Sequence, residues 1–146
     1  MSDKARALIA GLSLISVAVI WMAAIANETT SYGSLLPSLV LGGIGCGLFW
    51  APSASIVLGA VSEEEQGLAS GANNAIREVG GLFGVAVLTS IFSAHGGFGT
   101  PGSFVQGMTP AFFIGGVIVG LAAVAAFALP RRSRVEALQP ALAAGA

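Results

Sequence analysis

The chain has 146 residues, of which 55% are hydrophobic and only 9% are charged, and its net charge is −1. Soluble domains carry about 25% charged residues, so this composition excludes an ordinary soluble domain and predicts an integral membrane protein. The uncharged runs along the chain predict an all-α fold with four transmembrane helices. The single cysteine, Cys46, excludes an internal disulfide.

The first expected membrane span covers residues 7–26 and follows Lys4 and Arg6. Its 20 uncharged residues would extend about 30 Å as a helix, which is the thickness of a bilayer core. The basic start and the sequence Ala24-Ile25-Ala26 also fit a secretory signal peptide. However, the apolar run is longer than the roughly 7–15 residues of such a segment, so we expect the span to be retained.

The second expected span covers residues 35–61, which contain no charge and are long enough to cross the bilayer with some tilt. Gly43 and Gly47 form a GxxxG pair within it. Glycines at this spacing let two membrane helices approach closely, so the pair predicts a helix contact in preference to a ligand contact.

The third expected span, residues 70–94, is the place where charge runs directly into an apolar helix. Three acids, Glu63–Glu65, precede it, and Arg77 and Glu78 lie near its start. At 100° per residue, one narrow face of this helix combines polar side chains with glycines, as expected of a surface that packs on another membrane helix. That face contains Asn73, Arg77, Gly80 and Gly84.

The fourth expected span covers residues 110–129, after a glycine-rich loop at residues 95–109. Thr109-Pro110 provides an N-cap residue followed by a proline in the first turn, which predicts the start of the helix. Gly116 and Gly120 form a further GxxxG pair and predict a second close helix contact.

All six basic residues fall on the side of the two termini, which predicts that both termini are cytoplasmic. Residues 1–132 would then form the four-helix transmembrane region, and residues 133–146 a disordered cytoplasmic tail. The basic residues are Lys4, Arg6, Arg77, Arg131, Arg132 and Arg134.

Two stretches of the sequence resemble a known family. The first is the glycine-rich run Gly42–Leu48 with a proline soon after it, and the second is Glu65–Ala86, which contains EQGLASG and GGLFGVA. In this order and spacing they resemble the C-terminal end of a major facilitator superfamily (MFS) transporter, in the branch of fourteen-helix drug:proton antiporters. The resemblance covers about Ala5–Arg132, corresponding to the last four helices of that fold.

The resemblance implies a partial transporter of a proton-coupled multidrug efflux system, which exposes its substrate site alternately to each side of the plasma membrane. Its partners would be the bilayer, small amphipathic substrates and the missing N-terminal helices. The proton gradient would be the only coupling agent, with no cofactor. A cytoplasmic gate would involve Glu65, Asn73, Arg77 and Glu78, and residues lining the transport cavity would include Phe49, Trp50, Pro52 and Ser53.

Arg77 allows two interpretations. As an arginine near a helix end it could simply extend to the lipid headgroups. Alternatively, it could pair with one of the acids Glu63–Glu65, or with an acid of the missing half, and help to hold the cytoplasmic mouth closed.

The sequence departs from that family in lacking the first ten helices, and Met1 lies shortly before a span, which suits a truncated gene, a split gene or a misassigned start. One alternative is a stand-alone four-span exporter that works as a homo-oligomer, although residues 7–26 lack the acid that such a protein needs. Another is a membrane scaffold without transport activity. An enzyme is not expected, because the sequence has no metal cluster, nucleophile–base set or phosphate loop. Nucleic acid is not an expected partner.

Overall fold

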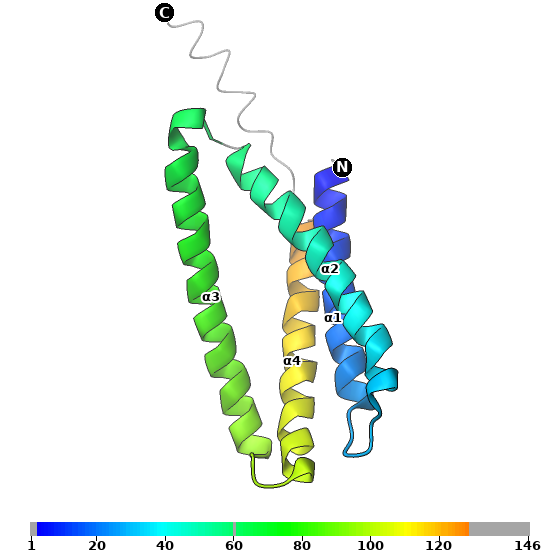
Figure 1. The fold of residues 1–146 in the computed structure, drawn as a ribbon. Helices are drawn as coiled ribbons and strands as arrows, with labels where there is room; N and C mark the ends of the chain where they lie inside the picture. The colour runs from blue at the N-terminus through cyan, green and yellow to red at the C-terminus, as the bar shows by residue number, and fades with distance from the viewer. Residues whose placement is uncertain (1–2, 60, 129–146) are drawn as a thin grey trace, which may run out of the picture.

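The computed structural model describes residues 3–59 and 61–128, which form four long helices and one short 3₁₀ turn (Figure 1). Each long helix is long and apolar enough to cross a membrane. This confirms the predicted all-α membrane fold. The predicted tail at residues 133–146 and the basic residues Arg131, Arg132 and Arg134 lie outside the described residues. The elements are α1 (Asp3–Ile25), α2 (Tyr32–Leu58), η1 (Glu63–Glu65), α3 (Gln66–His95) and α4 (Pro101–Ala128).

The helices run alternately up and down, so the N-terminus and the α2–α3 connection lie at one end of the bundle (Figure 1). The α1–α2 and α3–α4 loops lie at the other end. Helix α1 packs extensively against α2 and α4, whereas α3 packs against α4 and touches α2 over only a short stretch. In Figure 1, α3 accordingly stands apart from the other three helices along much of its length.

The buried positions are occupied by small residues. No large side chain among the described residues is fully buried. Membrane helices gain little from burying apolar groups away from lipid, so they associate through close backbone packing and interhelical hydrogen bonds. The buried residues of the four helices are Gly11, Ser16, Ala18, Ala23, Ser38, Gly45, Gly107, Ala111, Gly116 and Ala123.

Two close crossings fix α1 against its neighbours. At the first, α1 meets α2 so tightly that a Cβ on Gly11 would lie 2.8 Å from the carbonyl oxygen of Gly45. At the second, the Ser16 hydroxyl donates a hydrogen bond of 2.7 Å to the carbonyl oxygen of Gly116 on α4. Both crossings require a residue without a side chain, because a larger one would push the backbones apart.

Helix α4 begins at Pro101, so the prediction of a loop through residue 109 and a helix start at Thr109-Pro110 is wrong. The cause is an earlier Thr-Pro pair with a reciprocal cap. The Thr100 backbone N–H donates to the Ser103 hydroxyl, and the Ser103 N–H donates to the Thr100 hydroxyl, each at 3.2 Å. These bonds satisfy amides that a helix start otherwise leaves without partners. Pro110 therefore lies inside α4.

At the end of the bundle that carries the loops, the α1–α2 loop and the α3–α4 loop each contact the start of α4. The Gly97 N–H donates to the Ser103 carbonyl oxygen at 3.2 Å, and the Ser103 hydroxyl donates back to the Gly97 carbonyl at 3.0 Å. Glu28, in the α1–α2 loop, lies against the first turn of α4. A Cβ on Gly102 would lie 3.1 Å from its carboxyl carbon, so the absence of a side chain there makes room for Glu28.

Candidate functional site

Arg77 and Glu78 lie in the fourth turn of α3, in the half of the helix that follows the α2–α3 connection. They are the only charged residues within α3 apart from its terminal His95. The helix has no buried residue, so both side chains are accessible within this chain: the Arg77 side chain is 48% exposed and that of Glu78 is 69% exposed.

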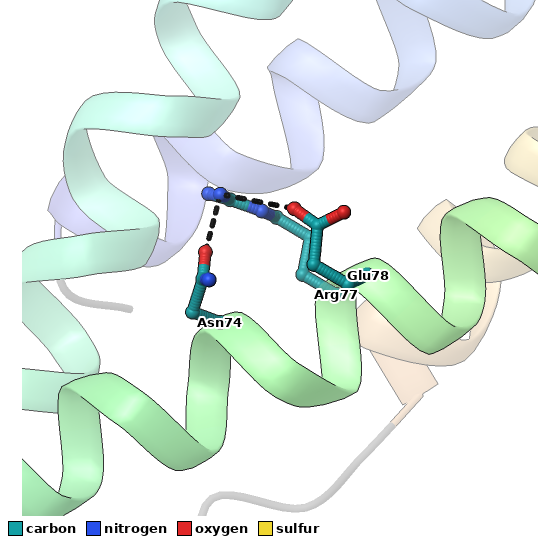
Figure 2. A network of polar contacts seen from close by, with 3 residues as sticks. All are labelled: Asn74, Arg77 and Glu78. Atoms are coloured by element: carbon teal, nitrogen blue, oxygen red, sulfur yellow. Dashed lines mark hydrogen bonds and ion pairs between the residues drawn. The ribbon is translucent and has the colours of Figure 1, made fainter.

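Arg77 contacts two neighbours on its own helix (Figure 2). Its guanidinium donates a hydrogen bond of 2.6 Å to the Asn74 side-chain oxygen, and it lies 3.8 Å from a carboxylate oxygen of Glu78. The spacing of three residues places Asn74 one turn earlier on the same face. Since exposed ion pairs contribute about 0–1 kcal/mol, the pair with Glu78 mainly orients the arginine.

The guanidinium also reaches a second helix. Its central carbon lies 4.7 Å from the centroid of the Trp50 ring on α2, a distance at which a cation is attracted by the negative face of an indole. Trp50 is itself supported by Phe49 in an edge-to-face contact, with 5.7 Å between the ring centroids and an angle of 77°. The sequence predicts roles for Trp50 and Arg77 separately and does not predict the contact between them.

A simple count of helical rise could have placed the two residues at similar depths. Trp50 lies about 12 Å before the end of α2, and Arg77 lies about 16 Å after the start of α3. Since the two helices are consecutive and antiparallel, these heights are similar. The two residues therefore had to lie at a comparable depth, at the end of the bundle where α2 leads into α3.

The other predicted gate residues lie close by without joining this cluster. The Glu65 carboxylate accepts a hydrogen bond of 3.0 Å from the Ser62 hydroxyl at the start of η1. Across residues 3–59 and 61–128, Arg77 with Glu78 is the one ion pair, so a pairing of Arg77 with Glu63–Glu65 is not seen. Asn73 is half-buried, and the amide that holds Arg77 is that of its neighbour Asn74.

The predicted cavity-lining residues lie on the last three turns of α2. Phe49, Pro52 and Ser53 are half-buried, and Trp50 is 46% exposed with Arg77 against its ring. Their role in lining a transport cavity remains a prediction.

The six predicted packing glycines fall into two groups. Gly116 and Gly120 meet α1, since a Cβ on Gly116 would lie 2.6 Å from Ile20 and a Cβ on Gly120 would lie 2.8 Å from the Ser16 hydroxyl. The other four have no non-neighbouring atom of the described chain within 4 Å of the Cβ position, so a packing partner for them remains a prediction. These are Gly43, Gly47, Gly80 and Gly84.

An apolar cavity of about 530 Å³ lies between α3 and the pair α1 and α4. Gly80 and Gly84 form part of its α3 wall, Val19 contributes from α1, and Gly115 contributes from α4. The space explains why the two α3 glycines have no neighbour, because α3 does not close against the other helices along its middle turns.

No group of three or more potential metal ligands occurs in the part of the chain that the structure describes. The chemistry that the Arg77 cluster offers is that of a charged interhelical contact: one cation, one carboxylate, one amide and one aromatic face.

The comparisons with known proteins agree on one family. The sequence profile of the Major Facilitator Superfamily matches residues 1–145. The chain is similar to the cephamycin export protein CmcT of Amycolatopsis lactamdurans, with 34% identity over 84% of this chain and 25% of that protein. It is also similar to the puromycin resistance protein pur8 of Streptomyces alboniger, with 30% identity over 65% of this chain and 18% of that protein. No solved structure matches the chain.

The chain spans only part of these relatives: about a quarter of the length of the cephamycin export protein and 18% of the length of the puromycin resistance protein. Four helices that can cross a membrane make it a multi-pass membrane protein. With the family profile matching nearly the whole chain, the protein belongs to the Major Facilitator Superfamily.

Proposed function

We propose that this chain forms the C-terminal four-helix part of an efflux transporter that carries small amphipathic molecules out of the cell. The observation that carries the proposal is the family match over residues 1–145, together with relatives that are named for export and for drug resistance. The remaining helices of the transporter would be its partner, and alternating access would be the transport mechanism.

The incomplete packing of α3 supports a role in a larger helical assembly. Although α3 is apolar enough to cross a membrane, none of its residues is buried within this chain. Its exposed large side chains include Ile76, Leu82 and Phe83. With Gly80 and Gly84 on the same helix, another helix could approach the backbone closely there.

We further propose the plasma membrane as the location, with both termini in the cytoplasm and the proton gradient as the energy source. The N-terminus and the α2–α3 connection share one end of the bundle; Lys4 and Arg6 lie in the first turn of α1, and Arg77 lies in the half of α3 nearer that connection, which is the distribution that retains an end on the cytoplasmic side. In this orientation the Arg77 and Glu78 cluster lies near the cytoplasmic mouth, where its contacts would change as the cavity opens.

The test is a reconstitution from two pieces. The chain is expressed in cells that lack their own drug exporters, either alone or with the part of the cephamycin export protein that lies outside the matching segment. Accumulation of a fluorescent cationic dye is measured, and co-purification through an affinity tag reports assembly.

We expect the co-expressed pieces to assemble and to lower dye accumulation, and we expect the chain alone to leave accumulation unchanged. The reason is that, apart from Asp3 at the start of α1, Glu78 is the only carboxylate in the four long helices that the structure describes, and it is already paired with Arg77, whereas proton coupling needs an ionisable group reachable from both sides. Pieces that assemble without lowering accumulation would contradict the efflux function. Dye export by the chain alone, lost in Glu78→Gln, would instead support a homo-oligomeric exporter.

A further inference from the structure

Helix α3 contacts α4 over its last turns, from Leu88 onward, and contacts α2 at Arg77. Near its C-terminus, Phe92 packs on Phe98 and Phe104 with ring centroids 5.0 and 5.5 Å apart. There a Cβ on Gly107 of α4 would lie 2.8 Å from the Phe92 ring, so the two helices are in close contact. Between this aromatic cluster and Arg77, the apolar cavity separates α3 from α1 and α4.

In the N-terminal half of α3, the partners of Arg77 differ in what they connect. Asn74 and Glu78 lie on α3 itself, so their contacts with Arg77 cannot hold α3 to another helix. Trp50 lies on α2. Since α2 and α3 touch over only a short stretch, this cation–π contact is one of the few contacts between them.

We propose that the face of the Trp50 indole is the docking site for Arg77, and that this contact sets the separation of α2 and α3 at the end of the bundle that carries the N-terminus. Asn74 and Glu78 act as positioning residues, because both contact the guanidinium from its own helix (Figure 2), and in this orientation it lies over the Trp50 ring. When the contact is lost, α3 swings away from α2 about the aromatic cluster of Phe92, Phe98 and Phe104.

The physical basis is that the Trp50 ring lies on a helix packed closely against α1, whereas Arg77 lies on a helix without such a crossing nearby. Phe49 supports the indole from its own helix, and α2 is firmly packed on α1 at the Gly45 crossing. Helix α3 lacks such a crossing near Arg77, where Gly71, Gly80 and Gly81 have no atom of another helix within 4 Å of the Cβ position. The inference concerns this chain alone and does not depend on the proposed efflux function.

The experiment measures the distance between α2 and α3 in the full 146-residue chain in lipid nanodiscs. Cys46 is replaced by alanine, and spin labels are attached to cysteines at Ala54 and Ala72, two exposed residues about one turn from Trp50 and Arg77 respectively. Pulsed electron paramagnetic resonance then gives the distribution of distances between the labels.

We expect a narrow distribution in the parent chain and a broader one, shifted to longer distances, in Trp50→Leu and in Arg77→Gln. Glutamine can still donate to Asn74 but carries no charge, so this variant tests the cation alone. The double variant should resemble either single one, because both remove the same contact. Trp50→Phe, which keeps an aromatic face, should restore a distribution close to that of the parent.

Trp21→Leu is the matched control, because Trp21 is also an exposed tryptophan but lies on α1. We expect it to leave the distribution unchanged. The proposal would be overturned by a broad distribution in the parent chain, by an unchanged distribution in Trp50→Leu or Arg77→Gln, or by a Trp50→Phe variant as broad as Trp50→Leu.

Discussion

At the scale of single residues, Ser16 and Gly116 show how α1 and α4 are held together. The Ser16 side chain is buried and its hydroxyl donates to the Gly116 carbonyl oxygen, while the Gly116 Cα lies against Ile20. A hydrogen bond between membrane helices contributes about 0.6 kcal/mol on average and rarely more than about 1.7. The close approach of the backbones therefore matters at least as much as the hydrogen bond that it permits.

We predict that Gly116→Val destabilises the chain more than Ser16→Ala does. The valine would force α1 and α4 apart, at a cost of about 1–3 kcal/mol for an overpacked site, whereas the alanine removes only the hydrogen bond. Stability can be measured by denaturation in mixed micelles, followed by far-ultraviolet circular dichroism. Gly43→Val is the control, since nothing lies within 4 Å of its Cβ position. An equal loss in Gly43→Val would mean that backbone propensity, and not packing, decides the outcome.

The cluster around Arg77 shows how much about single residues can be predicted from the sequence. Arg77 and Glu78 stand out in the sequence because they interrupt an apolar helix, and the structure places them in one cluster. The heights of two antiparallel helices place Trp50 at a depth similar to that of Arg77, but only the structure shows that its ring faces the guanidinium. The predicted roles of these residues in gating remain predictions.

At the scale of elements, the four helices follow directly from runs of apolar residues as long as a bilayer is thick, and the structure confirms all four. Helix starts are harder to predict, because they depend on caps of a few atoms. The pairs Thr100-Pro101 and Thr109-Pro110 give the same local signal. Only the first has a serine three residues after its threonine to complete the reciprocal cap, and there the helix begins.

We predict that Thr100→Ala loosens the first turn of α4, because it removes a cap worth about 1 kcal/mol. Hydrogen–deuterium exchange of the peptide that covers residues 102–106 should become faster. Thr109→Ala serves as the control, since Thr109 lies inside the helix and should leave that exchange unchanged. Faster exchange in Thr109→Ala alone would indicate that the later pair starts the stable part of the helix.

At the scale of the whole molecule, the orientation in the membrane can be tested with three exposed positions. In a Cys46→Ala background, single cysteines replace Ser31 and Gly99 in the two loops at one end, and Ser62 in the connection at the other end. If the basic end is cytoplasmic, an impermeant maleimide should label the first two sites in intact cells and the third only after lysis. Labelling of Ser62 alone in intact cells would reverse the proposed topology.

The arrangement of the helices is less accessible to sequence reasoning than their number. Both Gly43 with Gly47 and Gly116 with Gly120 have the GxxxG spacing, yet only the second pair meets another helix among the described residues. The GxxxG spacing indicates that another helix can approach closely, but it does not indicate which helix does so. The pairing of α1 with both α2 and α4 depends on the whole bundle and cannot be read from any one segment.

The small buried residues have a consequence for how this protein tolerates change. In a soluble domain, the sites that resist substitution are mostly large apolar side chains, and shortening them leaves cavities. Here the buried sites are glycine, alanine and serine, so the damaging substitutions are those that enlarge a side chain and not those that shorten one. In a saturation mutagenesis scan, we expect the intolerant positions to be these small buried residues. Every substitution of a glycine adds side-chain atoms, so at the buried glycines nearly every substitution should be damaging. Enlargement of the smallest residues is therefore the principal route by which sequence drift would separate α1 from its neighbours.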